Sequence, residues 1–443
     1  MPGPYVVPVQ SDSELPDEVD VVVIGGGIIG ASTALELSER GLRVALCEKG
    51  GIGHEQSSRN WGWVRISRRD PREVPLMAHA LEMWKDLDVR LGRDTGYKRA
   101  GIIFTCADDA EYDKHERWNH NLASYDLESR MLSSNELQQL LPHQTMRLKG
   151  ALYTAADGRA EPQKAAPAIA EGARDRGAKV FVECAVRGIE TSGGRVSGVV
   201  TERGSIRCSA VVLAGGAWSS LFCANNNLRL PQLKVMNSVL RTHPLEGGPT
   251  QAIWSKDFAL RQRQDGGYTV ANGHENVVDI VPDSFRFAKD FVPALSKEWR
   301  SLSLRLADRF FVEARMAKRW SLDEPSPFEY ARVLDPKPST ALSDAALHNL
   351  TRAFPVFLKA TIAQRWAGYI DATPDAVPVI SAVDSVPGFH IATGFSGHGF
   401  GIGPAAGRLM ADLVTGSTPV VDPAAFRFSR FSDGSKIEVI SGF

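Results

Sequence analysis

The sequence has few cysteines and no long apolar run. Its five cysteines are an odd number and lack the spacing of a metal-binding motif: Cys47, Cys106, Cys184, Cys208 and Cys223. This usage predicts reduced thiols in a cytoplasmic protein and no bound metal. No stretch reaches the ~18 apolar residues that a membrane-spanning helix needs. Residues 1–20 lack the basic start and apolar core of a signal peptide, so we expect neither a leader nor a membrane span.

The net charge of the chain is also close to zero. The chain has 51 Lys and Arg against 52 Asp and Glu, which gives a formal charge of −1. Such a balance favours neither nucleic acid nor anionic lipid as a partner, so we expect a small-molecule ligand. A hydrophobic content of 43% and a charged content of 23% are typical of a globular protein. At 443 residues the chain is too long for one core, and two domains are expected.

Residues 20–49 carry the strongest local pattern. An apolar run at 21–24 predicts a strand buried on both faces, and it leads into a GxGxxG motif. The three glycines permit a tight turn, close approach of a pyrophosphate and close packing of the helix expected at 28–40. Glu48 follows the next strand, where a carboxylate can bind both hydroxyls of an adenosine ribose. The segment predicts a dinucleotide-binding βαβ unit; a glycine-rich turn without a ligand is the alternative.

The segment that follows is rich in hydrogen-bond donors and aromatic rings. Residues 57–60 (SSRN) can donate to phosphates or to a cofactor ring. Trp61, Trp63 and Arg65 alternate, so an extended chain points all three the same way. One interpretation is the wall of a substrate pocket, with a guanidinium for a carboxylate. The other is an aromatic core patch beside a surface arginine, and the pattern leaves both open.

A second glycine-rich stretch lies near the C-terminus. A strand is expected at 390–393, and a glycine loop at 394–403 leads into a helix that we expect to open at Pro404. The loop therefore predicts a second site where backbone N–H groups and a helix dipole stabilise negative charge. A further strand at 209–214 ends in paired glycines, which also allow close approach of a ligand.

Together these motifs resemble the FAD-dependent D-amino-acid oxidase superfamily, which includes glycine oxidase, sarcosine oxidase and L-amino acid deaminase. The matching segments follow the family order along the whole chain: VVVIGGGIIGASTALELSERGLRVALCEK, DGRAEP, AVVLAGGAWS, RWAGYIDATPDAVPVI and ATGFSGHGFGIGPAAG. The stretch HEQSSRNWGWVRISRRDPREVPLM is similar to that of L-amino acid deaminases and related bacterial amine dehydrogenases.

The resemblance implies an α/β fold in which a Rossmann-like FAD-binding domain is joined to a substrate domain with a large antiparallel (mixed) β-sheet. Both domains are expected to be discontinuous. The FAD-binding domain would comprise residues 16–90, 151–230 and 355–443, and the substrate-binding domain residues 91–150 and 231–354.

The resemblance also implies the cofactor-binding residues. Gly25, Gly27, Gly30 and Glu48 would hold the ADP part, Ser57 to Asn60 would line the phosphates and flavin, and Val186 would touch adenine. The full expected set is Gly25, Gly27, Ile28, Ile29, Gly30, Glu48, Lys49, Ser57, Ser58, Arg59, Asn60, Trp61, Val186, Ala214, Gly215, Trp218, Gly368, Gly397, His398, Gly399, Phe400 and Gly401.

The chain departs from its relatives at three points. The cysteine that links flavin in monomeric sarcosine oxidase falls near Gly368, so we expect noncovalent FAD. The N-terminal membrane segment of the membrane-bound deaminases is expected to be missing. The oxygen-activating lysine of sarcosine oxidases has no identifiable counterpart, which leaves open an oxidase using oxygen or a dehydrogenase using a quinone or another carrier.

The implied reaction is oxidation of the C–N bond of an amino acid or N-substituted amino acid (EC 1.4 or 1.5). Hydride passes to flavin N5, and the imine hydrolyses to a keto acid or aldehyde plus amine. Arg65 and Arg261 are the expected carboxylate anchors, with Arg263 as a competitor, and His398 and Tyr369 are further expected catalytic residues. A surface arginine, a loop-bonded histidine and a packing tyrosine are the alternatives.

Other functions stay open on the same scaffold. They are oxidation of another amine or of a 2-hydroxy acid, a flavoprotein subunit of a hetero-oligomeric opine- or sarcosine-type oxidase, and a catalytically silent FAD-binding protein. A homo- or hetero-oligomer is compatible with each.

Overall fold

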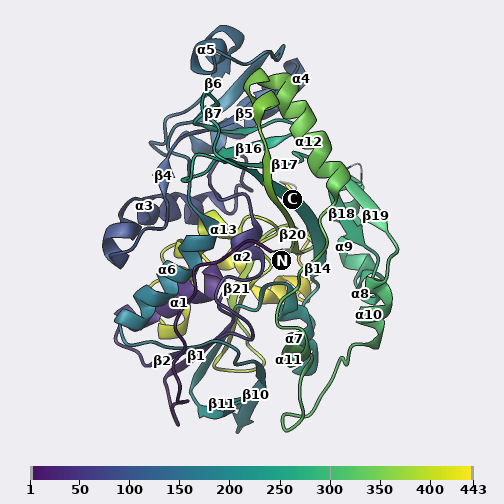
Figure 1. Ribbon diagram of the computed structural model, residues 1–443. Coiled ribbons are helices and arrows are strands. Elements are labelled where there is room, and N and C mark those ends of the chain that lie inside the picture. Colours follow the sequence, from purple (N-terminus) through teal and green to yellow (C-terminus); the bar gives the residue numbers. More distant parts are fainter. Residues whose placement is uncertain (1–2, 300, 441–443) are drawn as a thin grey trace.

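The computed structural model describes residues 3–299 and 301–440 and is built around two large sheets (Figure 1). The smaller has six strands in the order β21-β22-β13-β1-β2-β9, all parallel except β21. Their bounds are β21 (Val379–Ala382), β22 (Phe389–Thr393), β13 (Ala210–Leu213), β1 (Val21–Ile24), β2 (Val44–Cys47) and β9 (Lys179–Phe181). The apolar run at 21–24 is the central, fully buried strand β1, as expected for a parallel sheet covered on both faces.

Helices α1 (Ile28–Glu39), α6 (Pro162–Asp175) and α13 (Gly399–Thr415) pack together beside this sheet, and α3 (Val74–Leu91) lies against α13 (Figure 1). Helix α1 ends before Gly41 and α3 before Gly92, and both glycines have positive φ, the conformation typical of a residue just past a helix C-terminus. One apolar core joins these helices to the sheet and continues under the second sheet.

Helix α13 begins earlier than the sequence analysis expects. The helix starts at Gly399 instead of Pro404, so part of the expected glycine loop is helical. The glycines serve close packing between elements. A Cβ on Gly407 would lie 2.5 Å from the backbone of Ser32 in α1, and one on Gly403 would lie 3.0 Å from Ile28. The absence of side chains therefore lets α13 and α1 approach each other.

The second sheet has ten strands and is mixed. Its path is β19-β18-β14-β17-β16-β15-β5-β7-β6, with β20 also paired to β14. The pairs β15/β5 and β18/β19 are parallel and the other pairs antiparallel. The bounds are β5 (Ile102–Cys106), β6 (Ser129–Ser133), β7 (Gly150–Thr154), β14 (Leu233–Thr242), β15 (Ala252–Trp254), β16 (Ala259–Gln262), β17 (Tyr268–Ala271), β18 (Asn276–Asp279), β19 (Leu302–Arg305) and β20 (Ile362–Ala372).

Helix α12 (Thr340–Ala353) packs on β14 and β17, and α4 (Asp109–Asn119) packs on β6 and β7. Figure 1 shows this second sheet above and beside the first, with β14 and β20 running along the boundary. The α/β architecture with one parallel sheet and one large mixed sheet is confirmed. Strand β20, which lies in the segment expected to bind the cofactor, pairs along its whole length with β14. By its residue numbers β20 belongs to the proposed FAD-binding domain, but its hydrogen bonds place it in the sheet of the proposed substrate-binding domain.

The remaining elements are short. Two small sheets have the orders β10-β11-β12 and β3-β8-β4. Their strands are β3 (Trp63–Val64), β4 (Lys98–Arg99), β8 (Gly158–Arg159), β10 (Val186–Ser192), β11 (Arg195–Thr201) and β12 (Gly204–Arg207). The other α-helices are α2 (Gln56–Arg59), α5 (Ser134–Leu140), α7 (Ser219–Asn225), α8 (Pro282–Arg286), α9 (Ala288–Glu298), α10 (Arg309–Arg315) and α11 (Pro327–Tyr330). Within the described residues, no helix combines the length and apolarity needed to cross a membrane.

Candidate functional site

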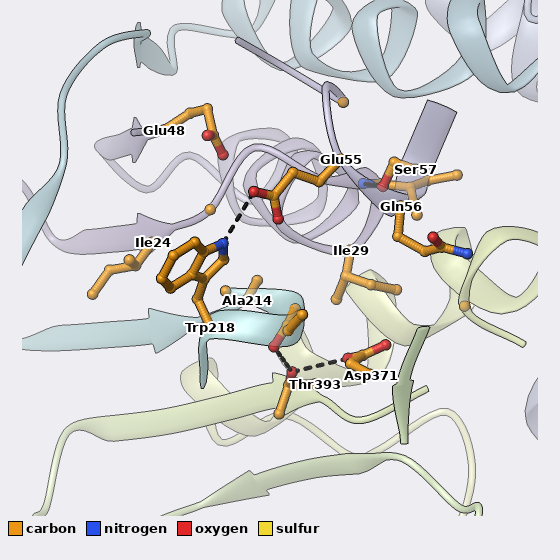
Figure 2. Close-up of a pocket in the computed structure, with 18 of the residues that line it drawn as sticks. Ile24, Ile29, Glu48, Glu55, Gln56, Ser57, Ala214, Trp218, Asp371 and Thr393 are labelled. Atoms are coloured by element: carbon orange, nitrogen blue, oxygen red, sulfur yellow. Dashed lines mark hydrogen bonds between the residues drawn. The ribbon is translucent and has the colours of Figure 1, made fainter. Parts of the chain in front are cut away.

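A first cavity opens at the carboxyl ends of β1, β2 and β13, between the N-termini of α1 and α13 (Figure 2). Ligands of open parallel sheets bind at this edge. The sequence-predicted residues that line it are Gly25, Gly27, Ile28, Ile29, Glu48, Lys49, Ser57, Asn60, Val186, Ala214, Gly215, Trp218, Tyr369, Gly397, Gly399 and Phe400. They come from segments spread across the chain, and the fold brings them around one space.

The turn between β1 and α1 has no room for side chains. Gly25 has a φ of +106°, and a Cβ there would lie 2.4 Å from the carbonyl oxygen of Ala214. A Cβ on Gly30 would lie 1.9 Å from the carbonyl oxygen of Gly25. Helix α1 then begins after Gly27, with no acidic residue in its first turn, and the Ser57 hydroxyl accepts a hydrogen bond from the Ile28 N–H at 2.9 Å. A helix N-terminus that faces a cavity favours an anion such as a phosphate.

The Glu48 carboxylate is fixed at the end of β2. Its two oxygens accept hydrogen bonds from the backbone N–H groups of Gly26 and Gly50, both at 2.7 Å. Burial raises the pKa of Glu48. Each carboxylate oxygen has a second lone pair, so the group can still accept hydrogen bonds from hydroxyls in the cavity.

The sequence analysis missed three hydrogen bonds between residues that line this cavity, two of which Figure 2 shows. The indole N–H of Trp218 donates to Glu55 at 3.0 Å, and Lys49 also donates to Glu55 at 2.8 Å. Also in the lining, Asp371 accepts a hydrogen bond from the Thr393 hydroxyl at 3.3 Å. Burial raises the pKa of Asp371 to about 6. No short motif marks Trp218 with Glu55 or Asp371 with Thr393, because the two residues of each pair lie 163 and 22 positions apart.

A second cavity, of about 420 Å³, adjoins the first. Gln56, Asn60, Gly397 and Phe400 line both, so the two spaces meet at these residues. This volume lies in the range of small-molecule sites.

One wall of the second cavity is aromatic. Trp61 contacts Trp63 (ring centroids 5.1 Å apart), Trp63 contacts Phe104 (6.2 Å), and Phe104 stacks on Trp254 (5.7 Å). The indole N–H of Trp61 donates to Asn237 at 3.0 Å. Trp61, Trp63 and Arg65 all line this cavity, as their alternation indicates.

Arg65 is the notable cation of this cavity. Its guanidinium lies over the Phe104 ring, 5.6 Å from the centroid, and donates to the carbonyl oxygen of Ser67. Burial lowers its pKa to about 9, which leaves it protonated at neutral pH. Among the described residues, no carboxylate lies within ion-pair distance of Arg65, whereas the neighbouring Arg69 pairs with Glu73 at 2.9 Å. A partly buried cation without a counter-ion is costly unless a ligand supplies the anion.

His398 lines the second cavity and follows Gly397, which lines both. Its Nδ1 is 3.5 Å from Oε1 of the fully buried Glu73, and its carbonyl oxygen accepts a hydrogen bond from Arg69 at 2.8 Å. Burial lowers the pKa of His398, so the ring is neutral near pH 7. Gly401, one turn into α13, also lines the second cavity.

Several expected site residues line neither cavity. Gly30 and Ser58 lie behind the lining, and Gly368 is covered by Gln56 and Arg59, because a Cβ there would lie 2.4 Å from Oε1 of Gln56. The Arg59 guanidinium lies outside both cavities and donates to Asp335 at 2.6 Å and to the carbonyl oxygen of Ala367 at 2.9 Å.

Arg261 and Arg263 also lie outside both cavities. Arg261 pairs with Glu161 at 2.8 Å, and Arg263 lies 3.8 Å from the same carboxylate. The Glu161 carboxylate holds both cations in the interior, so we do not retain them as substrate anchors. Tyr369 lines the first cavity and not the second; its ring lies under the Arg309 guanidinium, 3.8 Å from the centroid.

Comparisons with known proteins agree with this architecture. Residues 20–413 match a family model described as FAD dependent oxidoreductase. Among solved structures, the L-amino acid deaminase from Proteus myxofaciens in complex with anthranilate is 36% identical, with a TM-score of 0.93 and 97% of each chain covered.

Two curated relatives add to this. Mouse mitochondrial sarcosine dehydrogenase is 26% identical over 97% of this chain, which spans only 43% of that protein. The sarcosine oxidase subunit beta of Rhizobium meliloti is 24% identical over 95% of this chain and 90% of its own length.

Proposed function

Because the chain belongs to the family of FAD-dependent oxidoreductases, we propose that it oxidises the C–N bond of an amino acid or N-substituted amino acid (EC 1.4 or 1.5). Bound FAD supplies the hydride acceptor. The resulting imine hydrolyses to a keto acid or aldehyde plus ammonia or an amine. The task of the chain's own residues is to bind, orient and desolvate the substrate.

The first cavity fits FAD. The α1 N-terminus, with no acidic residue in its first turn, suits the pyrophosphate, and the fixed Glu48 carboxylate suits the ribose hydroxyls. The N-terminus of α13, which has no side-chain cap, would lie by the isoalloxazine. Cys47 is the cysteine in the lining and sits beside Glu48 at the ribose end. The position that would link flavin is Gly368, which supports noncovalent FAD.

Arg65 carries the proposal for the substrate. It is a protonated, largely desolvated guanidinium that lines the second cavity and, among the described residues, pairs with no carboxylate. A substrate carboxylate is the anion that such a group binds best. The aromatic wall formed by Trp61, Trp63, Phe104 and Trp254 would hold apolar substituents. The deaminase from Proteus myxofaciens was solved with anthranilate, a molecule that combines an amino group, a carboxylate and an aromatic ring.

His398 is the proposed polar contact for the amine. With Nδ1 facing Glu73, the ring proton belongs on that nitrogen, and Nε2 is left as an acceptor. A neutral imidazole in the lining of the second cavity favours the neutral amine, which is the form that can lose hydride.

A second candidate function is the flavoprotein subunit of a hetero-oligomeric oxidase. It is favoured by the match to 90% of a sarcosine oxidase subunit beta. Oxidation of another amine or a 2-hydroxy acid would use the same cavities. The electron acceptor would be oxygen in an oxidase, or a quinone or another carrier in a dehydrogenase.

The test is an anaerobic screen of the FAD-loaded protein. Amino acids of both configurations, N-methyl amino acids, simple amines and 2-hydroxy acids are added, and flavin bleaching near 450 nm is followed. The proposal expects bleaching by at least one amine that carries a carboxylate. Bleaching only by simple amines or by 2-hydroxy acids would overturn it, and purification with one stoichiometric partner would favour the subunit function.

A further inference from the structure

One wall of the first cavity comes from a segment that the sequence analysis places in the substrate-binding domain. This segment, residues 320–335, contains the short helix α11, and we call it the strap. Helix α11 lies beside α7 (Figure 1), and its Phe328 lines the cavity together with Val186 and Trp218. Because Val186 is the residue expected to touch adenine, the strap forms the wall where the adenine of FAD would lie.

Aromatic contacts hold Phe328 against the cavity. Its side chain is buried, and its ring centroid lies 5.7 Å from that of Trp218 and 6.1 Å from that of Phe222 on α7. The Trp320 ring, at the start of the strap, lies 5.3 Å from it. The Trp320 indole N–H donates to the carbonyl oxygen of Arg187 at 2.8 Å. Phe328 therefore presents a fixed aromatic ring to the cavity, which suits the flat face of an adenine.

Two arginine–carboxylate pairs anchor the strap beside β10 and β11. The Arg187 guanidinium on β10 donates to both oxygens of Glu329 at 3.0 Å. The Arg332 guanidinium pairs with both oxygens of Glu202, the residue after β11, with 2.5 Å to Oε2. All four side chains are partly exposed to solvent. Salt therefore weakens both pairs.

The strap is also bonded to the segment that follows β2. Lys49 Nζ donates to the carbonyl oxygen of Arg332 at 2.6 Å, and Arg332 donates to the carbonyl oxygen of Lys49 at 2.8 Å. The Leu334 N–H donates to the Glu55 carboxylate at 2.9 Å. That carboxylate also accepts hydrogen bonds from Lys49 and Trp218. Since Lys49, Glu55 and Trp218 all line the first cavity, movement of the strap changes three of its side chains.

The strap packs directly on the segments that flank it. A Cβ on Gly50 would lie 2.8 Å from the carbonyl oxygen of Arg332, and one on Gly188 in β10 would lie 2.5 Å from the Leu322 side chain. Contacts this close leave no room for a purine between the strap and these segments. An adenine can pass this wall only if the strap moves away.

We propose that the strap is a gate for the cofactor: Phe328 covers the adenine, and the two ion pairs of the strap open when FAD enters or leaves. Both pairs join parts of the protein that are present with and without FAD. Breaking them should therefore speed both uptake and release of FAD and change its dissociation constant much less. The inference depends on FAD as the cofactor and goes beyond the proposed reaction. It is measured without any substrate, so its failure leaves that reaction standing.

The first experiment measures FAD release from the loaded protein, by the fluorescence of free FAD after dilution, and FAD uptake by the apoprotein. The double variant Arg187→Gln/Arg332→Gln should release and take up FAD about fivefold or more faster than the native protein. Arg93→Gln is the matched control, because Arg93 is as exposed as Arg332 (34%), pairs with Asp175 and lies outside both cavities. It should leave both rates unchanged. Unchanged rates in the double variant, or faster release with unchanged uptake, would overturn the gate.

The second experiment uses salt and does not need the double variant. NaCl should speed FAD release from the native protein and from Arg93→Gln, because it screens the two ion pairs of the strap. In Arg187→Gln and in Arg332→Gln, each of which keeps one pair, the acceleration should be smaller. Equal acceleration in all four proteins would contradict the proposal.

The third experiment tests the role of Phe328. Phe328→Ala should weaken FAD binding about fivefold or more, as expected for the loss of a ring that contacts a base. ADP, which carries the adenine without the flavin, should lose affinity by a similar factor, and Phe328→Tyr, which keeps the ring, should recover most of the loss. Equilibrium dialysis gives the dissociation constants. Equal affinities of the native protein and Phe328→Ala for both ligands would show that Phe328 does not cover the adenine.

Discussion

The guanidinium of Arg261 lies 2.8 Å from the carboxylate of Glu161, and both side chains are almost fully buried. Strand β16 brings the arginine, and the residue before α6 brings the carboxylate. Arg261 also donates to the carbonyl oxygen of Ala160 at 3.1 Å and to the Thr269 hydroxyl at 3.2 Å. The pair therefore links the large sheet to α6, the helix that packs on α1. Arg261 has a structural role, in contrast to the binding role proposed for Arg65.

Replacing Arg261 should damage stability more than substrate recognition. Arg261→Ala leaves the Glu161 carboxylate buried without its main cation, which costs about 3–5 kcal/mol. Denaturant unfolding of the apoprotein measures this loss, and Arg261→Met combined with Glu161→Gln should recover part of it. If Arg261→Ala has normal stability and loses activity only toward substrates that carry a carboxylate, Arg261 is a substrate anchor.

Replacing Glu48 should weaken FAD retention. Glu48→Ala removes the fixed acceptor for the ribose hydroxyls, and the loss of one such contact predicts about tenfold or more weaker binding. Glu48→Gln keeps the shape and one acceptor oxygen, so it should fall between the native protein and the alanine variant. Equilibrium dialysis of reconstituted protein gives the dissociation constants. Unchanged affinity in Glu48→Ala would contradict the assignment of the ribose to this end of the cavity.

Acid treatment should release the flavin intact. The proposed noncovalent binding predicts that all yellow colour passes to the supernatant when the protein is precipitated with acid, and that the released compound is FAD by chromatography. Colour that stays with the precipitate would show a covalent link that the lining residues do not suggest.

The buried carboxyl of Asp371 should make the stability of the apoprotein depend on pH. Its pKa is raised from the ordinary value of 3.8 to about 6 in the folded state. The folded state thus favours the protonated form, so the stabilisation is present below pH ~4 and is lost as the pH rises through about 6. The shift corresponds to about 3 kcal/mol. The free energy of unfolding of Asp371→Asn should lack this pH-dependent contribution, because the asparagine carries no charge. If the free energy of unfolding changes with pH in the same way in both proteins, the prediction is wrong.

The sequence predicts the parts of the site that lie within short segments. The turn after β1 and the alternating Trp61, Trp63 and Arg65 depend on local geometry, so spacing alone places them around the cavities. The prediction that α13 begins at Pro404 is wrong, because a high glycine content is typical of a loop. Gly403 and Gly407 instead allow α13 to pack closely on α1, and no local sequence pattern indicates this contact.

The interactions that sequence reasoning missed join distant segments. Arg261 looked like a cavity arginine, and its partner Glu161 lies 100 positions away. Asp371 and Thr393 are 22 positions apart and meet only because β20 and β22 end at the same cavity. Pairings of this kind depend on the tertiary fold, and a single sequence carries no signal for them.

The most direct test of the central claim is stopped-flow reduction of the flavin by an amino acid and by its decarboxylated amine, in the native protein and in Arg65→Ala. Loss of the guanidinium should slow reduction by the amino acid about thirtyfold to several-thousandfold, as expected for about 2–5 kcal/mol from a charged pair. The amine should be affected much less, FAD content should stay normal, and Arg65→Lys should recover part of the rate. Equal rates for native protein and Arg65→Ala with the amino acid would contradict the account.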